Sequence, residues 1–190
     1  MTGTVSTTDN TAARRRFLRQ GLALGMGAGA MAAAPLSVAA TSSRRVHLIN
    51  DHTWEKLDIV YYTHGMYIDE SLAQINHLMR DHRVNREIRM DPQLLDQIEM
   101  LQRNIGAAEP IHILSGYRTP ETNARLRKRS PGVAKYSLHM EGRAADIYIP
   151  GVDISAVRNA ALDLKAGGVG YYSSSGFVHI DTGRVRTWGS

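Results

Sequence analysis

Residues 137–146 read S-L-H-M-E-G-R-A-A-D, with a histidine and an aspartate seven residues apart on either side of a glycine. Gly142 predicts a turn, and the alternation over residues 144–149 predicts a strand in which Ala144 and Asp146 share one face. Alanine at that neighbouring position leaves open space beside the aspartate. Burying a carboxylate in an apolar strand is costly unless a cation, a hydrogen-bond donor or a metal compensates it. The stretch therefore predicts a strand in which Asp146 faces a cation, a hydrogen-bond donor or a metal.

A second stretch, F-V-H-I-D at residues 177–181, places His179 and Asp181 on one face of another predicted strand. If this strand pairs with the strand of Asp146, then His139, Asp146 and His179 converge on one point. Two imidazoles and a carboxylate are a frequent zinc set in hydrolases, because three protein ligands leave the fourth position for water. The chain contains no cysteine, which excludes thiol catalysis and sulfur-ligated zinc.

A single histidine is more often a satisfied polar residue than a metal ligand. The interpretation as a metal site therefore depends on all three residues together: the spacing of His139 and Asp146, and the strand faces on which Asp146 and His179 lie. The remaining histidines lack a comparable motif: His47, His52, His64, His77, His82 and His112. Arg118 follows a predicted buried strand at residues 111–115, and it could be a solvated surface charge. Its position at a strand tip instead favours binding of a carboxylate.

Periodicity and turn signals predict an α+β fold, with helices on one side of a mostly antiparallel sheet. A hairpin opens the domain, two helices follow it, and strands then alternate with helices. The predicted strands are residues 46–50, 56–62, 111–115, 144–149, 169–172 and 177–181. The predicted helices begin at Asp69, Asp91-Pro92, Thr119-Pro120 and Asp153, the second ending at Gly106 and the last at Gly167-Gly168.

The first 40 residues have the parts of an export signal. A basic head is followed by an apolar run at residues 21–34, Pro35 and a small-residue site at residues 37–39. The pair Arg14-Arg15 is typical of the twin-arginine route. We therefore predict a twin-arginine signal peptide at residues 1–40, cleaved after Ala39 or Ala40, and a domain at residues 41–190 in the periplasm. The alternatives are a flexible basic arm or an uncleaved anchor, but the run is shorter than the ~20 apolar residues of a spanning helix.

The formal charge of +5 and the isoelectric point near 9.7 raise the possibility of a nucleic-acid partner. The predicted signal peptide, however, carries four arginines and one aspartate, so the formal charge falls by three to +2 after cleavage. A nucleic-acid interpretation then depends on total charge alone, and we expect no such partner.

Four stretches together resemble the zinc peptidases of the D-alanyl-D-alanine carboxypeptidase and murein endopeptidase group, in particular its YcbK-like, M15-like branch. They are the S-x-H-x-x-G-x-A-x-D pattern of residues 137–146, S-G-Y-R-T at 115–119, K-A-G-G-V-G-Y-Y at 165–172 and G-F-V-H-I-D-T-G at 176–183. The resemblance covers essentially the whole chain after the predicted signal peptide. It implies one zinc-peptidase domain of the D-Ala-D-Ala carboxypeptidase/hedgehog type.

The resemblance also implies roles for particular residues. His139, Asp146 and His179 would hold Zn²⁺, and Arg118 would bind the carboxylate or carbonyl group of the substrate. Ser137 would form a hydrogen bond near the site. The implied substrate is a peptide of peptidoglycan, which contains D-amino acids and meso-diaminopimelate.

Two positions depart from the pattern of this group. Its enzymes commonly place an acidic general base three residues before the last histidine ligand, where this chain has Gly176, and often a histidine at the position of Phe177. Asp181 is the first candidate for the base and Glu141 the second, unless the site is only weakly catalytic. Asp181 could equally form a hydrogen bond with the His179 imidazole and set its tautomer.

These observations predict a zinc-dependent murein endopeptidase that acts in cell-wall remodelling. The bond is either the D-alanine–diaminopimelate or the diaminopimelate–diaminopimelate cross-link, with trimming of a terminal D-alanine less favoured. The alternative is a non-catalytic, zinc-containing module that binds peptidoglycan, because the usual carboxylate is absent at Gly176.

Overall fold

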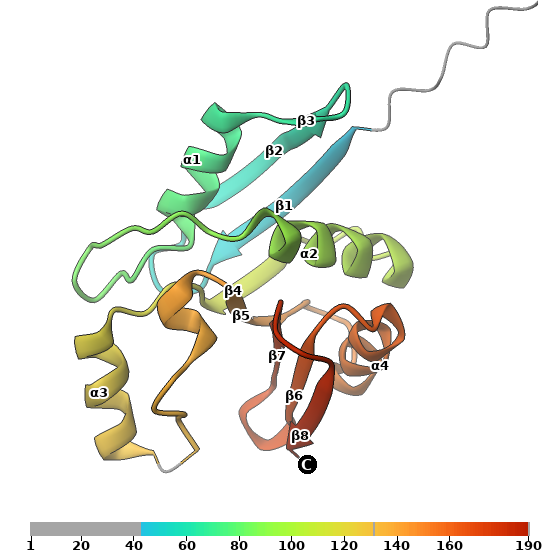
Figure 1. Cartoon of the computed structure of the whole chain (residues 1–190). Helices are drawn as coiled ribbons and strands as arrows, with labels where there is room; N and C mark the ends of the chain where they lie inside the picture. The colour runs from blue at the N-terminus through green and yellow to red at the C-terminus, as the bar shows by residue number, and fades with distance from the viewer. Residues whose placement is uncertain (1–42, 131, 190) are drawn as a thin grey trace, which may run out of the picture. The chain divides into compact units, whose positions relative to one another are not determined.

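The computed structural model describes residues 43–130 and 132–189, and within them it forms an eight-stranded sheet with the order β3-β2-β1-β4-β5-β7-β6-β8 (Figure 1). The predicted signal peptide lies outside the described residues. The strands are β1 (Arg44–Asn50), β2 (Lys56–Thr63), β3 (Met66–Tyr67), β4 (Ile111–Ser115), β5 (Ala144–Tyr148), β6 (Gly168–Tyr172), β7 (Phe177–Asp181) and β8 (Arg186–Gly189).

Most neighbouring strands pair in antiparallel fashion, and the parallel pairs are β1 with β4 and β6 with β8. The predicted α+β class, with its opening hairpin, is confirmed. Strands β3 and β8 are not predicted from the sequence, because the first is two residues long and the second lacks an alternating apolar pattern. The second omission matters, since β8 extends the sheet at the edge of β6, which in turn pairs with β7.

Helices α1 (Asp69–Leu78), α2 (Pro92–Ile105) and α4 (Ile154–Leu164) cover one face of the sheet and build the core with it. Asp91 caps α2 by accepting a hydrogen bond from the Gln93 amide at 3.0 Å. The core contains apolar residues of these helices and of the strands beneath them: Leu72, Ile75, Leu94, Leu95, Ile98, Leu101, Val157, Val46, Leu48, Ile111, Ile113, Ile147, Val178 and Ile180. With the apolar side chains on this face, the other face of the sheet is left for polar groups.

Helix α3 (Pro120–Arg129) is built differently, because its buried residues, Thr122 and Asn123, are polar. It extends away from the sheet in Figure 1. Its N-cap, Thr119, is held by the buried carboxylate of Asp81, which accepts hydrogen bonds from the Thr119 amide and hydroxyl, each at 2.9 Å. Polar contacts therefore fix the helix that follows Arg118.

Helix α4 ends earlier than predicted, at Leu164, with Lys165 in the left-handed conformation. The glycine pair expected to stop the helix serves packing instead. A Cβ atom at Gly167 would lie 1.7 Å from the Asp181 carbonyl oxygen, so only glycine fits against β7. The sequence pattern shows glycines at this point, but not the strand that they pack against.

The turn after β4 is tightly packed against the end of α1. The Tyr117 amide donates a hydrogen bond to the Met79 carbonyl oxygen at 2.8 Å, and a Cβ atom at Gly116 would lie 2.4 Å from the same oxygen. A substitution here must displace backbone rather than a flexible side chain.

We therefore expect Gly116→Ala to lower the free energy of unfolding by about 1–3 kcal/mol, the range for overpacking a close contact. Denaturant unfolding measures this loss. Gly132→Ala is the matched control, since Gly132 is exposed and a Cβ atom there would lie 3.8 Å from its nearest neighbour. Equal stability of the two variants would contradict the close packing at Gly116.

No helix in the described part of the chain is long and apolar enough to cross a membrane.

Candidate metal centre

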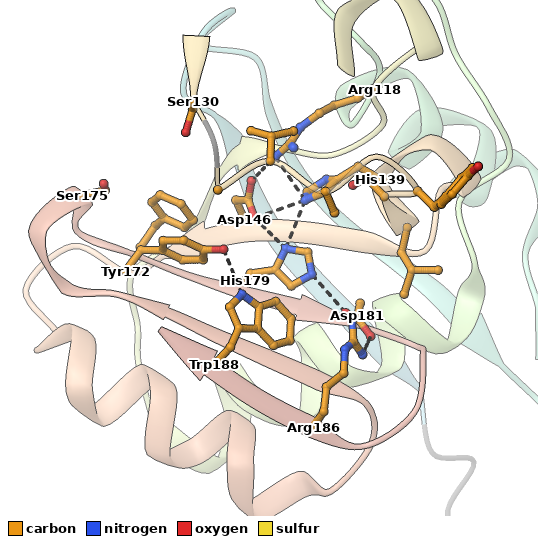
Figure 2. Close-up of a pocket in the computed structure, with 17 residues that line it drawn as sticks. Arg118, Ser130, His139, Asp146, Tyr172, Ser175, His179, Asp181, Arg186 and Trp188 are labelled. Atoms are coloured by element: carbon orange, nitrogen blue, oxygen red, sulfur yellow. Dashed lines mark hydrogen bonds and ion pairs between the residues drawn. The ribbon is translucent and has the colours of Figure 1, made fainter. Parts of the chain in front are cut away.

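His139, Asp146 and His179 come from three elements that the fold brings together (Figure 2). Asp146 and His179 are directly opposite each other on β5 and β7. His139 lies in a short 3-10 helix, η1 (Leu138–Glu141), which ends at Gly142 in the left-handed conformation with a φ of 68°. Glycine adopts this conformation at no steric cost, so the chain turns directly from η1 into β5.

The atoms facing one another form a small triangle. His139 Nε2 lies 3.2 Å from Asp146 Oδ1 and 3.1 Å from His179 Nδ1, and the third side, from His179 Nδ1 to Asp146 Oδ1, is 2.9 Å. Two ligand atoms of a tetrahedral zinc ion are about 3.3 Å apart when each bond is about 2.0–2.1 Å. The triangle is therefore close to the size that one such ion requires.

The outer nitrogen of each imidazole shows which tautomer faces inward. His139 Nδ1 lies 2.7 Å from the Gly116 carbonyl oxygen, and His179 Nε2 lies 3.1 Å from Asp181 Oδ2. Both partners are acceptors, so these two nitrogens carry hydrogen, and in the neutral rings the lone pairs of the other nitrogens point into the space shared with Asp146 Oδ1. Three electron-pair donors therefore converge on one point, and a hydrogen bond to the outer nitrogen fixes the orientation of each imidazole. This donor set fits a divalent metal ion.

The pKa shifts of Asp146, His139 and His179 follow from their burial and their close approach. Burial alone would raise the pKa of Asp146, but His139, His179 and Arg118 outweigh burial and hold this pKa well below its usual range. Burial lowers the pKa of His139 and favours its neutral, ligating form. At His179 burial is overcome by the carboxylates of Asp146 and Asp181, which raise the pKa of the ring.

Arg118 lies beside the triangle. Its Nη2 donates a short hydrogen bond to Asp146 Oδ2 and lies 3.2 Å from His139 Nε2, while its Nε donates to the Ser115 hydroxyl at 2.8 Å. The Arg118 amide also donates to the His139 carbonyl oxygen at 3.1 Å. The guanidinium is thus fixed at the edge of the cavity that contains the ligands.

Asp181 is placed behind His179 and is fully buried. Its oxygens accept hydrogen bonds from the Gly168 amide at 3.0 Å, the Gly183 amide at 2.8 Å, and the Arg186 guanidinium at 3.0 and 2.6 Å. Burial opposes ionisation, but His179, Arg186 and the two amides lower the pKa of Asp181 far below its usual value. Its carboxylate is therefore charged and has its acceptor positions occupied.

Glu141, the second candidate base, is exposed and forms an ion pair with Arg143 at 3.1 Å. It does not belong to the lining of the cavity, whereas Ser137 does. Gly176 is at the turn between β6 and β7, with a φ of 70° and open space where a side chain would be. The structure therefore brings Arg118 and Asp181 to the triangle of His139, Asp146 and His179 and leaves Glu141 outside.

Two residues of β8 that the sequence did not indicate, Arg186 and Trp188, complete the site. They reach it across β6 because the facing residues there are glycines. Gly168 is paired with Arg186, and a Cβ atom at Gly168 would lie 2.3 Å from the Arg186 guanidinium. Gly170 is likewise paired with Trp188, and its Cβ atom would lie 2.7 Å from the indole. The glycines in the K-A-G-G-V-G-Y-Y stretch are the sequence signal for this arrangement.

His139, Asp146 and His179 line a cavity of about 450 Å³. One wall is the segment after α3, which contributes Ser130, Gly132, Val133, Ala134, Tyr136, Ser137 and Leu138. The other wall is formed by β6, β7 and β8 with the side chains of Tyr172, Phe177 and Trp188. Figure 2 shows Tyr172 and Trp188 on this wall. A cavity of this size accommodates part of a peptide against the metal ligands.

Two histidines and one aspartate that converge in an open cavity are typical of a single-metal hydrolase. Comparison with known proteins specifies which one: the chain belongs to the M15 peptidase family described as peptidoglycan L,D-endopeptidase MepK, whose model matches residues 38–188. Peptidases of this family are metal-dependent. The predicted kinship with the M15-like murein endopeptidases is confirmed.

Curated relatives match over most of their length. Peptidoglycan L,D-endopeptidase MepK of Escherichia coli (strain K12) is 43% identical over 176 residues, which cover 92% of this chain and 96% of the relative. Probable peptidoglycan L,D-endopeptidase MepK of Haemophilus influenzae is 37% identical over 177 residues, covering 92% of this chain and 95% of the relative. No solved structure gives a significant match.

Proposed function

We propose that this chain is a zinc-dependent endopeptidase that hydrolyses peptide cross-links of peptidoglycan. The observation that carries the proposal is the triangle of His139, Asp146 and His179, with sides of 2.9–3.2 Å, beside Arg118 in an open cavity. The kinship with peptidoglycan endopeptidases supports the substrate class.

The name of the relatives narrows the choice of the bond that is hydrolysed. An L,D-endopeptidase cleaves between an L- and a D-configured centre, and a diaminopimelate–diaminopimelate cross-link joins the L-centre of one residue to the D-centre of the next. Of the two cross-links that the sequence left open, we therefore propose this one rather than the D-alanine–diaminopimelate bond.

Zinc at the three ligands would supply a Lewis acid that polarises a carbonyl group and makes a water molecule more acidic. Arg118, anchored on Ser115 and Asp146, would bind a carboxylate of the stem peptide and orient it toward the ligands. In the hydrolysis the oxygen of water joins the carbonyl carbon, the carbon–nitrogen bond breaks, and a proton of that water ends on the leaving amine.

For Asp181 we propose a positioning role. Its carboxylate holds Nε2–H of His179 and keeps Nδ1 free to bind the metal. A general base must reach the reacting water, and a buried carboxylate that already accepts hydrogen bonds from two amides and Arg186 is poorly placed to do so.

Asp181→Asn separates the two roles. If Asp181 positions His179, zinc affinity is expected to fall about 10–100-fold, the usual effect of removing a partner of a ligating histidine, and excess zinc should restore much of the activity. Competition with a chelator measures the affinity. Unchanged zinc affinity with activity about 10²–10⁴-fold lower, whatever the zinc concentration, would instead identify a general base.

A non-catalytic peptidoglycan-binding module is the second candidate. Asp146 and Asp181 are the only carboxylates among the described residues lining the cavity, and both are engaged by other groups. Digestion of purified peptidoglycan, followed by separation and mass measurement of the released muropeptides, distinguishes the candidates. Loss of diaminopimelate–diaminopimelate dimers only in the presence of zinc is expected of the endopeptidase, and intact dimers with zinc bound would favour the binding module.

We also propose that the protein acts in the periplasm, after export through the twin-arginine signal at residues 1–40. The substrate class supports this location. N-terminal sequencing of the exported protein should find a start at Thr41 or Ala40, and retention of Arg14 and Arg15 would contradict cleavage.

A further inference from the structure

One wall of the cavity is built around Tyr172, which no step of the proposed function uses. Tyr172 is the last residue of β6 and pairs with Phe177 on β7, and the two rings stack with centroids 4.5 Å apart. Phe177 takes the position where the family pattern often has histidine, and the adjacent Gly176 takes that of its usual base. The aromatic wall thus stands where the sequence departs from that pattern.

Cross-strand pairing connects Tyr172 to the metal ligands. His179 on β7, Gly170 on β6 and Trp188 on β8 form one row across the three strands. Because Gly170 has no side chain, the Trp188 indole lies over it and approaches the His179 ring, with centroids 5.2 Å apart. Two residues beyond Gly170, Tyr172 points to the same side of the sheet.

The hydrogen bond between the two aromatic residues has a fixed direction. Trp188 Nε1 lies 2.9 Å from the Tyr172 hydroxyl oxygen, and an indole nitrogen can only donate. The tyrosine oxygen is therefore the acceptor, and its own hydrogen remains available. Within the described chain, no side chain or carbonyl accepts this hydrogen, and Tyr172 lines the cavity.

Figure 2 shows the Tyr172 hydroxyl and Trp188 on one side of the ligands and Arg118 on another. A substrate peptide against the ligands thus lies between a guanidinium and a hydroxyl donor. A preoriented donor stabilises a carbonyl oxygen most when that oxygen gains negative charge during attack by water.

We propose that Tyr172 is a catalytic residue that donates a hydrogen bond to the scissile carbonyl oxygen as it becomes negative, and that Trp188 is its positioning residue. The inference rests on the proposed endopeptidase function. Trp188 fixes the hydroxyl by donating to its oxygen, so that the remaining hydrogen points into the cavity. The proton balance of hydrolysis is unaffected, because Tyr172 only shares its hydrogen.

Tyr172→Phe tests the catalytic role, with Tyr171→Phe as the matched control. Tyr171 is the preceding residue of β6 but lies on the opposite face, against the core and beneath the Arg158 guanidinium at 4.6 Å. With purified cross-linked muropeptide dimer, kcat of Tyr172→Phe is expected to fall about 100-fold or more, the usual effect of losing one oxyanion donor, with little change in KM. Tyr171→Phe should stay within about twofold of wild type, since its hydroxyl is remote from the cavity.

A binding measurement supplies a readout independent of turnover. A phosphinate analogue of the cross-link carries tetrahedral oxygens that resemble the reacting carbon, and its affinity should fall by a factor similar to kcat in Tyr172→Phe. Zinc content should equal that of wild type. Unchanged kcat and phosphinate affinity would overturn the proposal for Tyr172, and so would a kcat loss fully explained by lost zinc. A wild-type protein that cleaves no dimer would instead refute the proposed function.

Trp188→Phe tests the positioning role, because phenylalanine keeps an aromatic ring over Gly170 but removes the Nε1–H donor. We expect kcat to fall roughly tenfold with KM unchanged. The double variant Tyr172→Phe/Trp188→Phe should be no slower than Tyr172→Phe alone, since Trp188 acts through the hydroxyl that is already missing. Losses that multiply would show that Trp188 does not act through Tyr172.

Discussion

Asp146→Asn is expected to reduce bound zinc from one ion per chain to almost none, and to reduce cleavage of cross-linked dimers to the level of chelated protein. Asp146 supplies the anionic corner of the ligand triangle through Oδ1 and anchors Arg118 through Oδ2. The amide of asparagine keeps the shape but loses the charge that a divalent cation and a guanidinium both require.

Asp153→Asn is the matched control for this change. Asp153 caps α4, where its carboxylate accepts a hydrogen bond from the Ser155 amide at 2.7 Å, and asparagine is an equally good N-cap. Metal analysis of the purified proteins should therefore find full zinc in Asp153→Asn. Full zinc content in Asp146→Asn would show that Asp146 is not a ligand.

Arg186→Ala should cause the largest loss of stability among the substitutions considered. It leaves the fully buried carboxylate of Asp181 without its guanidinium partner, whose nitrogens lie at 2.6 and 3.0 Å. Breaking a buried pair on one side costs about 3–5 kcal/mol, and we expect the lower end, about 3 kcal/mol, because the Arg186 side chain is 32% exposed. The melting temperature should fall by roughly 10 °C.

Thermal unfolding of the metal-free protein measures this effect without a contribution from zinc. Arg184→Ala is the control, since Arg184 is exposed and forms no ion pair with any described residue. The backbone carbonyl of residue 184, which accepts a hydrogen bond from Arg186, is retained in that control. Equal melting temperatures for the two variants would mean that solvent replaces the guanidinium at Asp181.

The convergence of His139, Asp146 and His179 could be predicted because it depends on local rules. Side chains alternate along a strand, so Asp146 and His179 face the same side once β5 and β7 pair, as they do. The glycine after η1 permits the sharp turn that returns His139 to them. Zinc itself, and the cleavage site of the signal peptide, remain predictions.

The supporting residues could not be predicted because they depend on a pairing between distant segments. Strand β8 has no alternating pattern, and its parallel contact with β6 places Arg186 and Trp188 opposite two glycines. A glycine stretch alone does not reveal which side chain fills the space above it. The two roles left open for Asp181 likewise differ only in burial and hydrogen bonding, which a single sequence does not contain.

Whether the three ligands hold a catalytic zinc is decided by titrating the metal-free protein with zinc while cleavage of a purified diaminopimelate–diaminopimelate dimer is followed by mass. We expect no cleavage without metal, and a rate that rises with zinc until one ion is bound per chain. Equal cleavage by the metal-free protein, or no cleavage at one bound zinc, would contradict a zinc-dependent endopeptidase.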